Sequence, residues 1–553
     1  MKNLKYIIAI GLMMAAIISC NEEEWLEEEA FDFYTPENSY TTPGQIDAAV
    51  TKLHENIRVM LFESNDNSFI FHYTTDIAYD AISPTHALNS WGDRIAPDAG
   101  EVRWMWQSYY EIVFNANAIL SRIDAVEYNS EEERNAQIAE AKFFRAWAYR
   151  GLGIMFGGVP LVLEEIKSPK RDFVRASQDE VWSQIISDLT DAVVDLPGAD
   201  ETPDGRVTSG AANHLLAEMY IITEDYDKAI AAATEVIENS GYALMTGRFG
   251  TRSGEPGDIY WDLFRRGNQN RGAGNTESIW VSQYEYLTPG GGRGDVLPRF
   301  LMPLYWQLKD ADGVNLFTGP NENFGGRGIG WWAPTDYWLI DIWQDANEDM
   351  RISEYNVIRD IVANNPASAF FGEPIVASGA IDDFNDPFNR WWNVILAKGA
   401  PIGNFPDEVI ADPETGLTTN DANHSYRDRY LMRLPETYLL RAEAHLMKGD
   451  QASAAVDINA VRTRVGADPV APAEVDIDYI LDERTRELFA EELRLLTLMR
   501  MGNIVERVRT FDPMHNGQFA SNPINDNQNL WPIPNSDIER NTEADLEQNP
   551  GYF

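Results

Sequence analysis

Residues 207–241 constrain the fold of this chain more than any other stretch. Their sequence, VTSGAANHLLAEMYIITEDYDKAIAAATEVIENSG, predicts two helices joined by a short turn. Small and aromatic residues stand where two such helices approach each other in a tetratricopeptide-type hairpin: Ala217, Tyr220, Ala229, Ala233 and Val236. A second copy, ETYLLRAEAHLMKGDQASAAVDINAVRTRVG, fills residues 436–466. Because one helix pair cannot bury its apolar face alone, the two copies predict a stack of helix pairs.

Three further helices are predicted before the first copy. Apolar residues recur at three- and four-residue steps over 104–123, 131–155 and 179–194. Between the copies the chain is rich in glycine, proline, asparagine and aromatic residues, with short strand-like pieces such as SIWVSQYEY at 278–286. We therefore expect a mostly α-helical superhelix of helix pairs with a long, irregular, aromatic-rich insertion that contains short strands. The expected domain spans 46–553, with a helical scaffold at about 46–245 and 426–553 and the insertion at about 246–425.

The N-terminus has the pattern of an export signal. A positively charged start precedes a 13-residue apolar stretch, Tyr6 to Ile18, which is too short to span a bilayer as a helix. Cys20 follows at once, and as the single cysteine of 553 residues it cannot form an internal disulfide. The arrangement resembles a bacterial lipobox, whose cysteine carries a lipid. We expect a signal peptide at 1–19, a lipid anchor at Cys20 and an acidic tether at 20–45.

The charge of the chain restricts its partners. There are 88 acidic and 44 basic residues, a formal net charge of −44. A surface this negative repels phosphate, so we expect no nucleic-acid partner. Anionic lipid headgroups are disfavoured for the same reason, which leaves the lipid on Cys20 as the expected membrane attachment.

Four sequence blocks recur in the order known from one protein family. They are AEAKFFRAWAYRGLGIMFGGVPLV (139–162), RLPETYLLRAEAHLMKGD (433–450), LDERTRELFAEELRLLTLMRMG (481–502) and LWPIPNSDIERNTEADLEQNPGYF (530–553). Together they resemble the SusD/RagB-like outer-membrane lipoproteins of Bacteroidetes. The third block departs from the family pattern at Glu492 and Thr497, which bears on packing more than on activity.

The resemblance implies a fold and a function. It implies about four tetratricopeptide-like helix pairs and no cofactor. It also implies a surface-exposed lipoprotein of the outer membrane that captures glycans and delivers them to a SusC-like TonB-dependent transporter. In the family the irregular loops carry the glycan site. The acidic residues after Cys20 resemble the surface-export signal of these bacteria.

The third block also holds charged residues that we interpret as structural. Arg484, Glu487, Glu491 and Arg494 are predicted to lie on one helical face, where they pair at i,i+3 and i,i+4 spacing. We expect them to form ionic contacts between helices and to take no part in chemistry.

Candidate glycan-binding residues lie in two places. A sugar ring lays its C–H face on an aromatic ring while its hydroxyls bond amides and charged groups, so exposed aromatics beside planar polar groups are expected. The turn ALNSWGDR offers Asn89, Trp91, Asp93 and Arg94, and the resemblance also implies an aromatic contact in this loop. The insertion offers Tyr284 and Tyr286, expected on one face of a strand, and Trp331, Trp332 and Trp338 in a glycine-rich stretch.

Signals of catalysis or metal binding are weak. The seven histidines are scattered, and the calcium-loop-like run from Asp345 has Met350 in place of the turn glycine and Asn356 in place of the closing glutamate. We therefore expect a binding protein with no metal and no catalytic residue. Two alternatives stay open. A glycosidase needs only two well-placed carboxylates among 88 acids, and a helical repeat can bind peptides.

Overall fold

The computed structural model describes residues 39–64, 67–72, 75–86, 89–344, 346–381, 390–517, 519 and 523–552. The predicted signal peptide, Cys20 and most of the tether lie outside these residues. The fold is mostly helical, as predicted. Its scaffold helices are α3 (Pro43–Arg58), α5 (Gly100–Arg122), α6 (Glu131–Phe156), α7 (Gln178–Asp195), α8 (Ser209–Ile222), α9 (Tyr226–Thr234), α13 (Leu434–Met447), α14 (Gln451–Thr463), α15 (Ile477–Leu488), α16 (Arg494–Arg500), α17 (Ile504–Phe511) and α18 (Asn535–Arg540).

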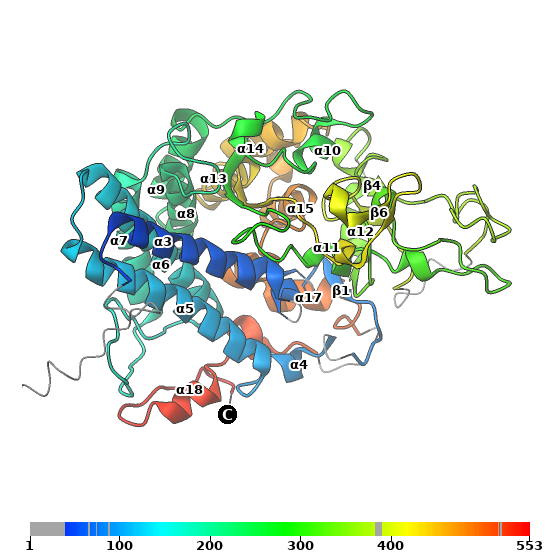
Figure 1. Cartoon of the computed structure of the whole chain (residues 1–553). Helices are drawn as coiled ribbons and strands as arrows, with labels where there is room; N and C mark the ends of the chain where they lie inside the picture. Colours follow the sequence, from blue (N-terminus) through cyan, green and yellow to red (C-terminus); the bar gives the residue numbers. More distant parts are fainter. Residues whose placement is uncertain are drawn as a thin grey trace, which may run out of the picture.

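Consecutive helices pack on one another as a stack of helix pairs. Helices α5 to α9 form the blue-to-green side of Figure 1, and α13 continues the stack by packing on α9 across the insertion. Side chains cap several helix starts: Thr208 accepts from the Ala211 amide, and Ser177 forms a capping box with Glu180. These caps lie where the sequence predicts helices to begin.

Two glycines set how closely α6 approaches its neighbours. A Cβ on Gly151 would lie 2.1 Å from the Tyr109 ring of α5, and one on Gly153 would lie 2.3 Å from the Trp182 ring of α7. Each glycine thus leaves room for a large aromatic ring of the next helix. Because interiors are close-packed, these contacts fix the spacing of three scaffold helices.

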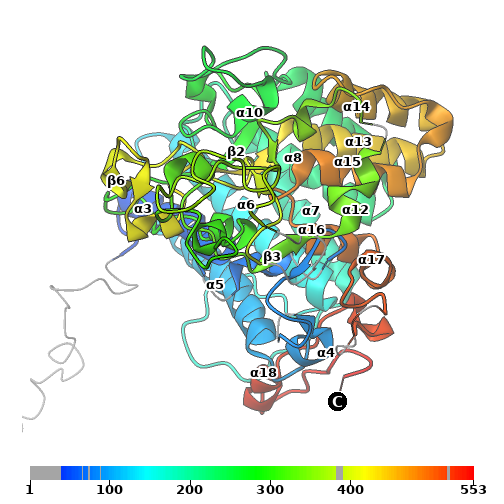
Figure 2. The same cartoon turned by 90° about the vertical axis from the view of Figure 1, so that its right-hand side faces the viewer.

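The insertion is built from short elements. Its helices are α10 (Ile259–Leu263), α11 (Leu297–Leu301) and α12 (Asp336–Leu339), and α4 (Trp91–Arg94) precedes the scaffold helix α5. Four antiparallel two-stranded sheets pair β1 (Ala78–Asp80) with β3 (Trp332–Pro334), β2 (Ser278–Ser282) with β8 (Arg429–Arg433), β4 (Val357–Ile358) with β5 (Ile395–Leu396), and β6 (Ile410–Asp412) with β7 (Leu417–Thr418). Its loops project to the right in Figure 1 and face the viewer in Figure 2.

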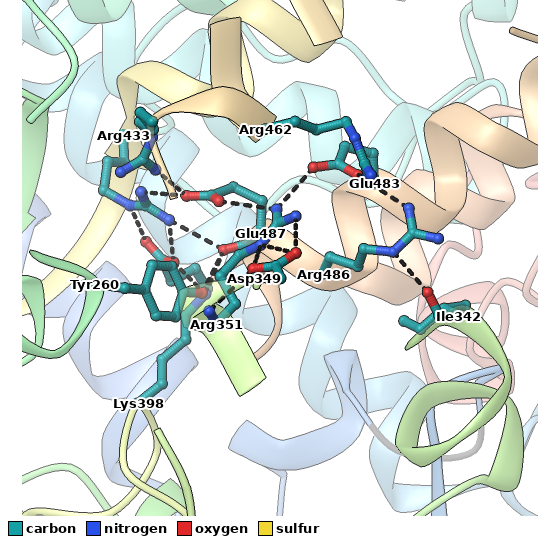
Figure 3. Close-up of polar contacts among 12 residues, drawn as sticks. Tyr260, Ile342, Asp349, Arg351, Lys398, Arg433, Arg462, Glu483, Arg486 and Glu487 are labelled. Atoms are coloured by element: carbon teal, nitrogen blue, oxygen red, sulfur yellow. Dashed lines mark hydrogen bonds and ion pairs between the residues drawn. The ribbon is translucent and has the colours of Figure 1, made fainter. Parts of the chain in front are cut away.

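A buried ionic network joins the insertion to the scaffold (Figure 3). Glu487 of α15 accepts from Arg433 of β8 at 2.6 Å and from Arg464, after α14, at 2.5 Å. Arg351 of the insertion reaches Glu483 at 2.7 Å and Glu487 at 3.2 Å. Lys398, also of the insertion, donates to the Glu487 carbonyl at 2.6 Å. The position of the insertion on the helices therefore depends on these charges.

The predicted ionic scaffold is present, but its helical arrangement is wrong. Helix α15 ends at Leu488, and Ala490 has a φ of 60°, so the chain turns before α16 begins. Glu491 consequently pairs with Arg433, and Arg494 pairs with Asp76 near β1 at 2.6 Å. The four residues connect several elements instead of one helical face.

In the part of the chain that the structure describes, no helix is both long enough and apolar enough to cross a bilayer.

Candidate functional site

The first sheet brings together the two stretches that the sequence singles out. Strand β1 lies just before the 87–94 turn, β3 begins at Trp332, and Asp80 pairs with Trp332 in antiparallel register. The Ala81 amide extends this pairing by donating to the Trp331 carbonyl at 2.9 Å. Trp331 therefore stands next to the loop that follows β1, and the His86 ring lies 6.4 Å from its ring.

Two adjacent tryptophans point to opposite sides at this place. Trp331 is half-buried and packs one side against Phe300 at a centroid distance of 5.2 Å. Trp332 is only 2% exposed and packs against Phe489 of the scaffold at 5.0 Å. This is the alternation expected along a strand. Trp331 thus keeps part of its ring open to solvent, while Trp332 holds the sheet on the scaffold.

A third segment completes this surface. The Arg390 guanidinium donates twice to the Ile329 carbonyl, at 3.0 and 2.6 Å, and lies 5.3 Å from the Trp391 ring centroid. Gly330 makes the approach possible, because a Cβ there would lie 2.0 Å from the Arg390 carbonyl oxygen. Its φ of 60° also favours glycine. Trp391 is 45% exposed, more than any other tryptophan in the described residues.

We call Asp80, His86, Trp331, Arg390 and Trp391 the Trp331 surface. His86 Nδ1 lies 3.2 Å from the Asp80 carboxylate, whose side chain is fully buried. Burial raises the pKa of Asp80 to about 7, against the charges of Arg94 and Arg390. Burial, followed by the same two arginine charges, holds the pKa of His86 below its ordinary value. At neutral pH the histidine is neutral, and Arg390 is the charge that the surface presents.

The 87–94 turn supports this surface from below. The Asn89 amide is spent on its own loop: its oxygen accepts from the Asp80 amide at 3.0 Å, and its nitrogen donates to the Asp80 and Ser83 carbonyls at 3.0 Å. Trp91 is 3% exposed and lies in the main core. Arg94 is buried and pairs with Glu101, whereas Asp93 is exposed and accepts from Ser90.

A buried Trp91 differs from the exposed platform expected for the turn. With 3% of its surface accessible, the indole offers no open face to a sugar ring. Trp338, at 4%, is also buried, and its ring lies 4.4 Å from Phe489. The sequence could not separate these rings from Trp331, because the partner that covers Trp338 lies about 150 positions away. Their role in binding stays a prediction.

The expectation that Tyr284 and Tyr286 share a strand face is wrong. Strand β2 ends at Ser282, before either tyrosine. Tyr284 is 8% exposed beside the Arg58 guanidinium. Tyr286 is half-buried, stacks edge-on with Tyr426 at 4.5 Å and donates to Asp421. Of the two, only Tyr286 has ring surface left for a ligand.

The residues missed from sequence are His86, Arg390 and Trp391. A weak signal existed, since Arg390-Trp391-Trp392 is an arginine followed by two aromatics in a run rich in Asp and Asn. Burial then separates the pair, because Trp392 is 1% exposed. Within the described residues no group of three or more His, Cys, Asp or Glu side chains could hold a metal ion.

The fold and surface define a class: a helix-repeat scaffold whose loop-rich insertion presents aromatic rings beside polar side chains. Two family models match this chain. The model described as "SusD family" matches residues 341–552, and the one described as "Starch-binding associating with outer membrane" matches residues 25–221. The chain belongs to the SusD/RagB-like family, as its sequence blocks indicate.

Similar proteins cover nearly the whole chain. The SusD-like protein P25 of Formosa agariphila is 25% identical over 92% of this chain and 91% of its own length. A laminarin-binding SusD-like protein of known structure has a TM-score of 0.68 at 22% identity, covering 93% of this chain and all of its own. Surface glycan-binding protein A from Bacteroides thetaiotaomicron, in complex with laminarihexaose, has a TM-score of 0.66 at 20% identity and covers 92% of this chain and all of its own. The two structures show that the fold is shared.

Proposed function

We propose that this protein captures oligosaccharides at the cell surface on the Trp331 surface. The observation that carries the proposal is the convergence of Trp331, Trp391 and Arg390 from distant parts of the insertion. Aromatic faces bind the C–H face of a sugar ring, and a guanidinium donates to its hydroxyls. Laminarin and laminarihexaose binding by two proteins of the same fold supports this reading.

The proposal includes a cellular setting. A lipid on Cys20 holds the domain at the outer face of the outer membrane, and the captured glycan passes to a SusC-like TonB-dependent transporter. The family description that mentions the outer membrane supports this place. The protein itself does no chemistry on the sugar.

Affinity measurements test the site. The protein is screened against laminarin, starch and an acidic polysaccharide by affinity electrophoresis, and the bound glycan is then titrated against Trp331→Ala and Trp391→Ala. Each variant should lose about 1–3 kcal/mol of binding free energy, as for truncation of a central aromatic. Phe114→Ala is the matched control, because Phe114 is 42% exposed on scaffold helix α5. Affinities of both tryptophan variants equal to that of the control would remove the site.

The two alternatives predict different results. A glycoside-cleaving protein would release reducing ends from the bound glycan. A peptide-binding repeat is favoured by one observation, a groove of about 820 Å³ between α15, α17 and the residues after α14, lined by Tyr479, Arg486 and Phe511 among others. Tyr479→Ala would then weaken ligand binding more than Trp331→Ala does.

A further inference from the structure

The loop between α6 and α7 exposes apolar side chains far from the Trp331 surface. It covers residues 157–177 and protrudes below the helices at the lower left of Figure 1, in teal, beside α18 in Figure 2. Leu163 is 38% exposed, Ile166 36% and Val174 65%. Exposed apolar groups gathered in one place commonly mark an interaction surface.

The base of this loop is held by buried hydrogen bonds. Asn117 donates to the Val162 carbonyl at 2.8 Å, and Arg145 donates to the Leu163 carbonyl at 3.1 Å. On the other arm, Arg175 donates to the Gly158 carbonyl at 2.6 Å, and the Glu543 amide donates to the Arg171 carbonyl at 2.8 Å. The scaffold therefore presents the apolar residues at a fixed place.

The tip of the loop is cationic. Residues 166–171, IKSPKR, hold three basic residues and no acidic one in a chain with twice as many acids as bases. The flanking acids are engaged: Glu165 pairs with Arg122 at 2.6 Å, and Asp172 pairs with Lys170 at 2.6 Å. Lys167 is 71% exposed. Because charges are screened over about 8 Å at physiological salt, this local balance outweighs the distant negative charge of the molecule at contact.

The apolar surface continues onto the neighbouring helix. Phe114 of α5 is 42% exposed, and a groove of about 550 Å³ beside it is lined by Trp106, Lys170 and Phe173 among others. Apolar atoms make up most of this lining. A mixture of apolar side chains and lysine or arginine is typical of segments that lie in a membrane interface.

The described chain begins next to this loop. The Tyr40 ring lies 5.4 Å from the Arg122 guanidinium, and Arg122 also bonds Glu165 of the loop. Cys20 is twenty positions before Tyr40, so an extended tether reaches at most about 70 Å. A lipid on Cys20 would thus hold this side of the domain near the bilayer.

We propose that the 163–174 loop is a membrane-contact site, which places Leu163, Ile166 and Val174 in the headgroup region while Lys167, Lys170 and Arg171 pair with anionic headgroups. This inference rests on the proposed lipid anchor. A single lipid gives weak attachment, and a basic patch adds about 1 kcal/mol per residue near an anionic surface. The contact would orient the domain so that the insertion is held away from the bilayer.

Site-specific labelling tests the contact. The full-length lipoprotein is purified from the outer membrane and reconstituted in phosphatidylcholine vesicles that contain phosphatidylglycerol. Because Cys20 is the single native cysteine and is consumed by the lipid, Ile166→Cys supplies the one free thiol for an environment-sensitive fluorophore. Val456→Cys, whose parent residue is 68% exposed on α14, is the matched control. The Ile166 label should show blue-shifted emission and quenching by lipid-borne nitroxide, and the control label should show neither.

A second variant tests the charges. Lys167→Glu with Arg171→Glu, placed in the Ile166→Cys background, should abolish the quenching at the loop, and salt should reduce it in the parent. Equal, water-like emission from both labels would overturn the proposal. So would a shift that appears only when another membrane protein is present, because the loop would then contact protein. The mass of the N-terminal peptide reports acylation separately; an unacylated Cys20 would overturn the anchor and this inference, whereas glycan binding would be unaffected.

Discussion

Glu487→Gln should destabilise the protein by breaking the junction between scaffold and insertion. The Glu487 side chain is fully buried, and its carboxylate accepts from Arg433 at 2.6 Å, from Arg464 at 2.5 Å and from Arg351 at 3.2 Å (Figure 3). Glutamine keeps the size of the side chain but removes its charge. Its amide nitrogen can only donate, and it faces guanidinium groups that also only donate.

The magnitude follows from what the neighbours retain. Breaking a buried ionic contact by removing one partner costs about 3–5 kcal/mol, since a charge is left uncompensated. Here Arg433 keeps Glu277 and Glu491, and Arg351 keeps Glu483. The loss in the free energy of unfolding should therefore lie near the lower limit, about 3 kcal/mol.

The effect should depend on pH in a defined direction. Burial opposes ionisation of Glu487, but the charges of Arg464, Arg433 and Arg351 outweigh it and hold its pKa below the ordinary 4.5. A carboxylate whose pKa is depressed by folding contributes stability above its unfolded pKa and loses it as the pH falls. The gap between the native protein and Glu487→Gln should be full at neutral pH and shrink below about pH 4.5.

Urea unfolding followed by tryptophan fluorescence, at neutral and at acid pH, measures this gap. Asp526→Asn is the matched control, a carboxylate-to-amide change in an exposed pair, because Asp526 is 89% and Arg509 44% exposed. An exposed pair contributes about 0–1 kcal/mol. The reasoning is refuted if Glu487→Gln loses no more than the control, or loses as much at acid pH as at neutral pH.

Three further changes have defined outcomes. Asp80→Asn should stabilise the protein increasingly from about pH 4 to about pH 8 in thermal unfolding, because burial raises the Asp80 pKa to about 7 and the native carboxylate loses stability as the pH rises through that value; a constant offset across this range would contradict it. Gly330→Ala should weaken glycan binding, measured by titration, more than Gly379→Ala does, because its Cβ would meet the Arg390 carbonyl whereas none lies within 4 Å at Gly379. Cys20→Ala should leave the outer-membrane fraction on immunoblots, and unchanged retention there would exclude the lipid anchor.

The helical part of the fold could be predicted because its signals are local. The predicted helices at 104–123, 131–155 and 179–194 correspond to α5 (Gly100–Arg122), α6 (Glu131–Phe156) and α7 (Gln178–Asp195). Each is marked by an apolar period of three to four residues and by residues that start or stop a helix. Both hairpin copies are also helix pairs in the structure, α8 with α9 and α13 with α14.

The insertion was harder because its order depends on distant residues. The strand predicted at 278–286 ends at Ser282, since only residues 278–282 pair with β8, which lies some 150 positions away. The charged residues of the third block were correctly interpreted as structural. Their partners were not predictable, because Arg494 meets Asp76 across the length of the chain.

The candidate site was predictable only as a composition. Sequence alone identified a turn and an aromatic-rich insertion, and the pairing of β1 with β3 brings them together. It could not rank Trp331 above Trp91 or Trp338, because a tryptophan serves equally well in a core and on a binding surface.

The sequence by itself determined the helical repeat pattern, the single cysteine after an apolar signal, the excess of acidic residues and the family blocks. These properties are written in local spacing and in composition. Only the tertiary structure decided which aromatic rings stay open, that Arg390 and His86 join Trp331, and that an apolar, cationic loop lies beside the start of the described chain. The physical reason is that exposure and charge pairing depend on contacts between residues far apart in sequence, which no local pattern contains.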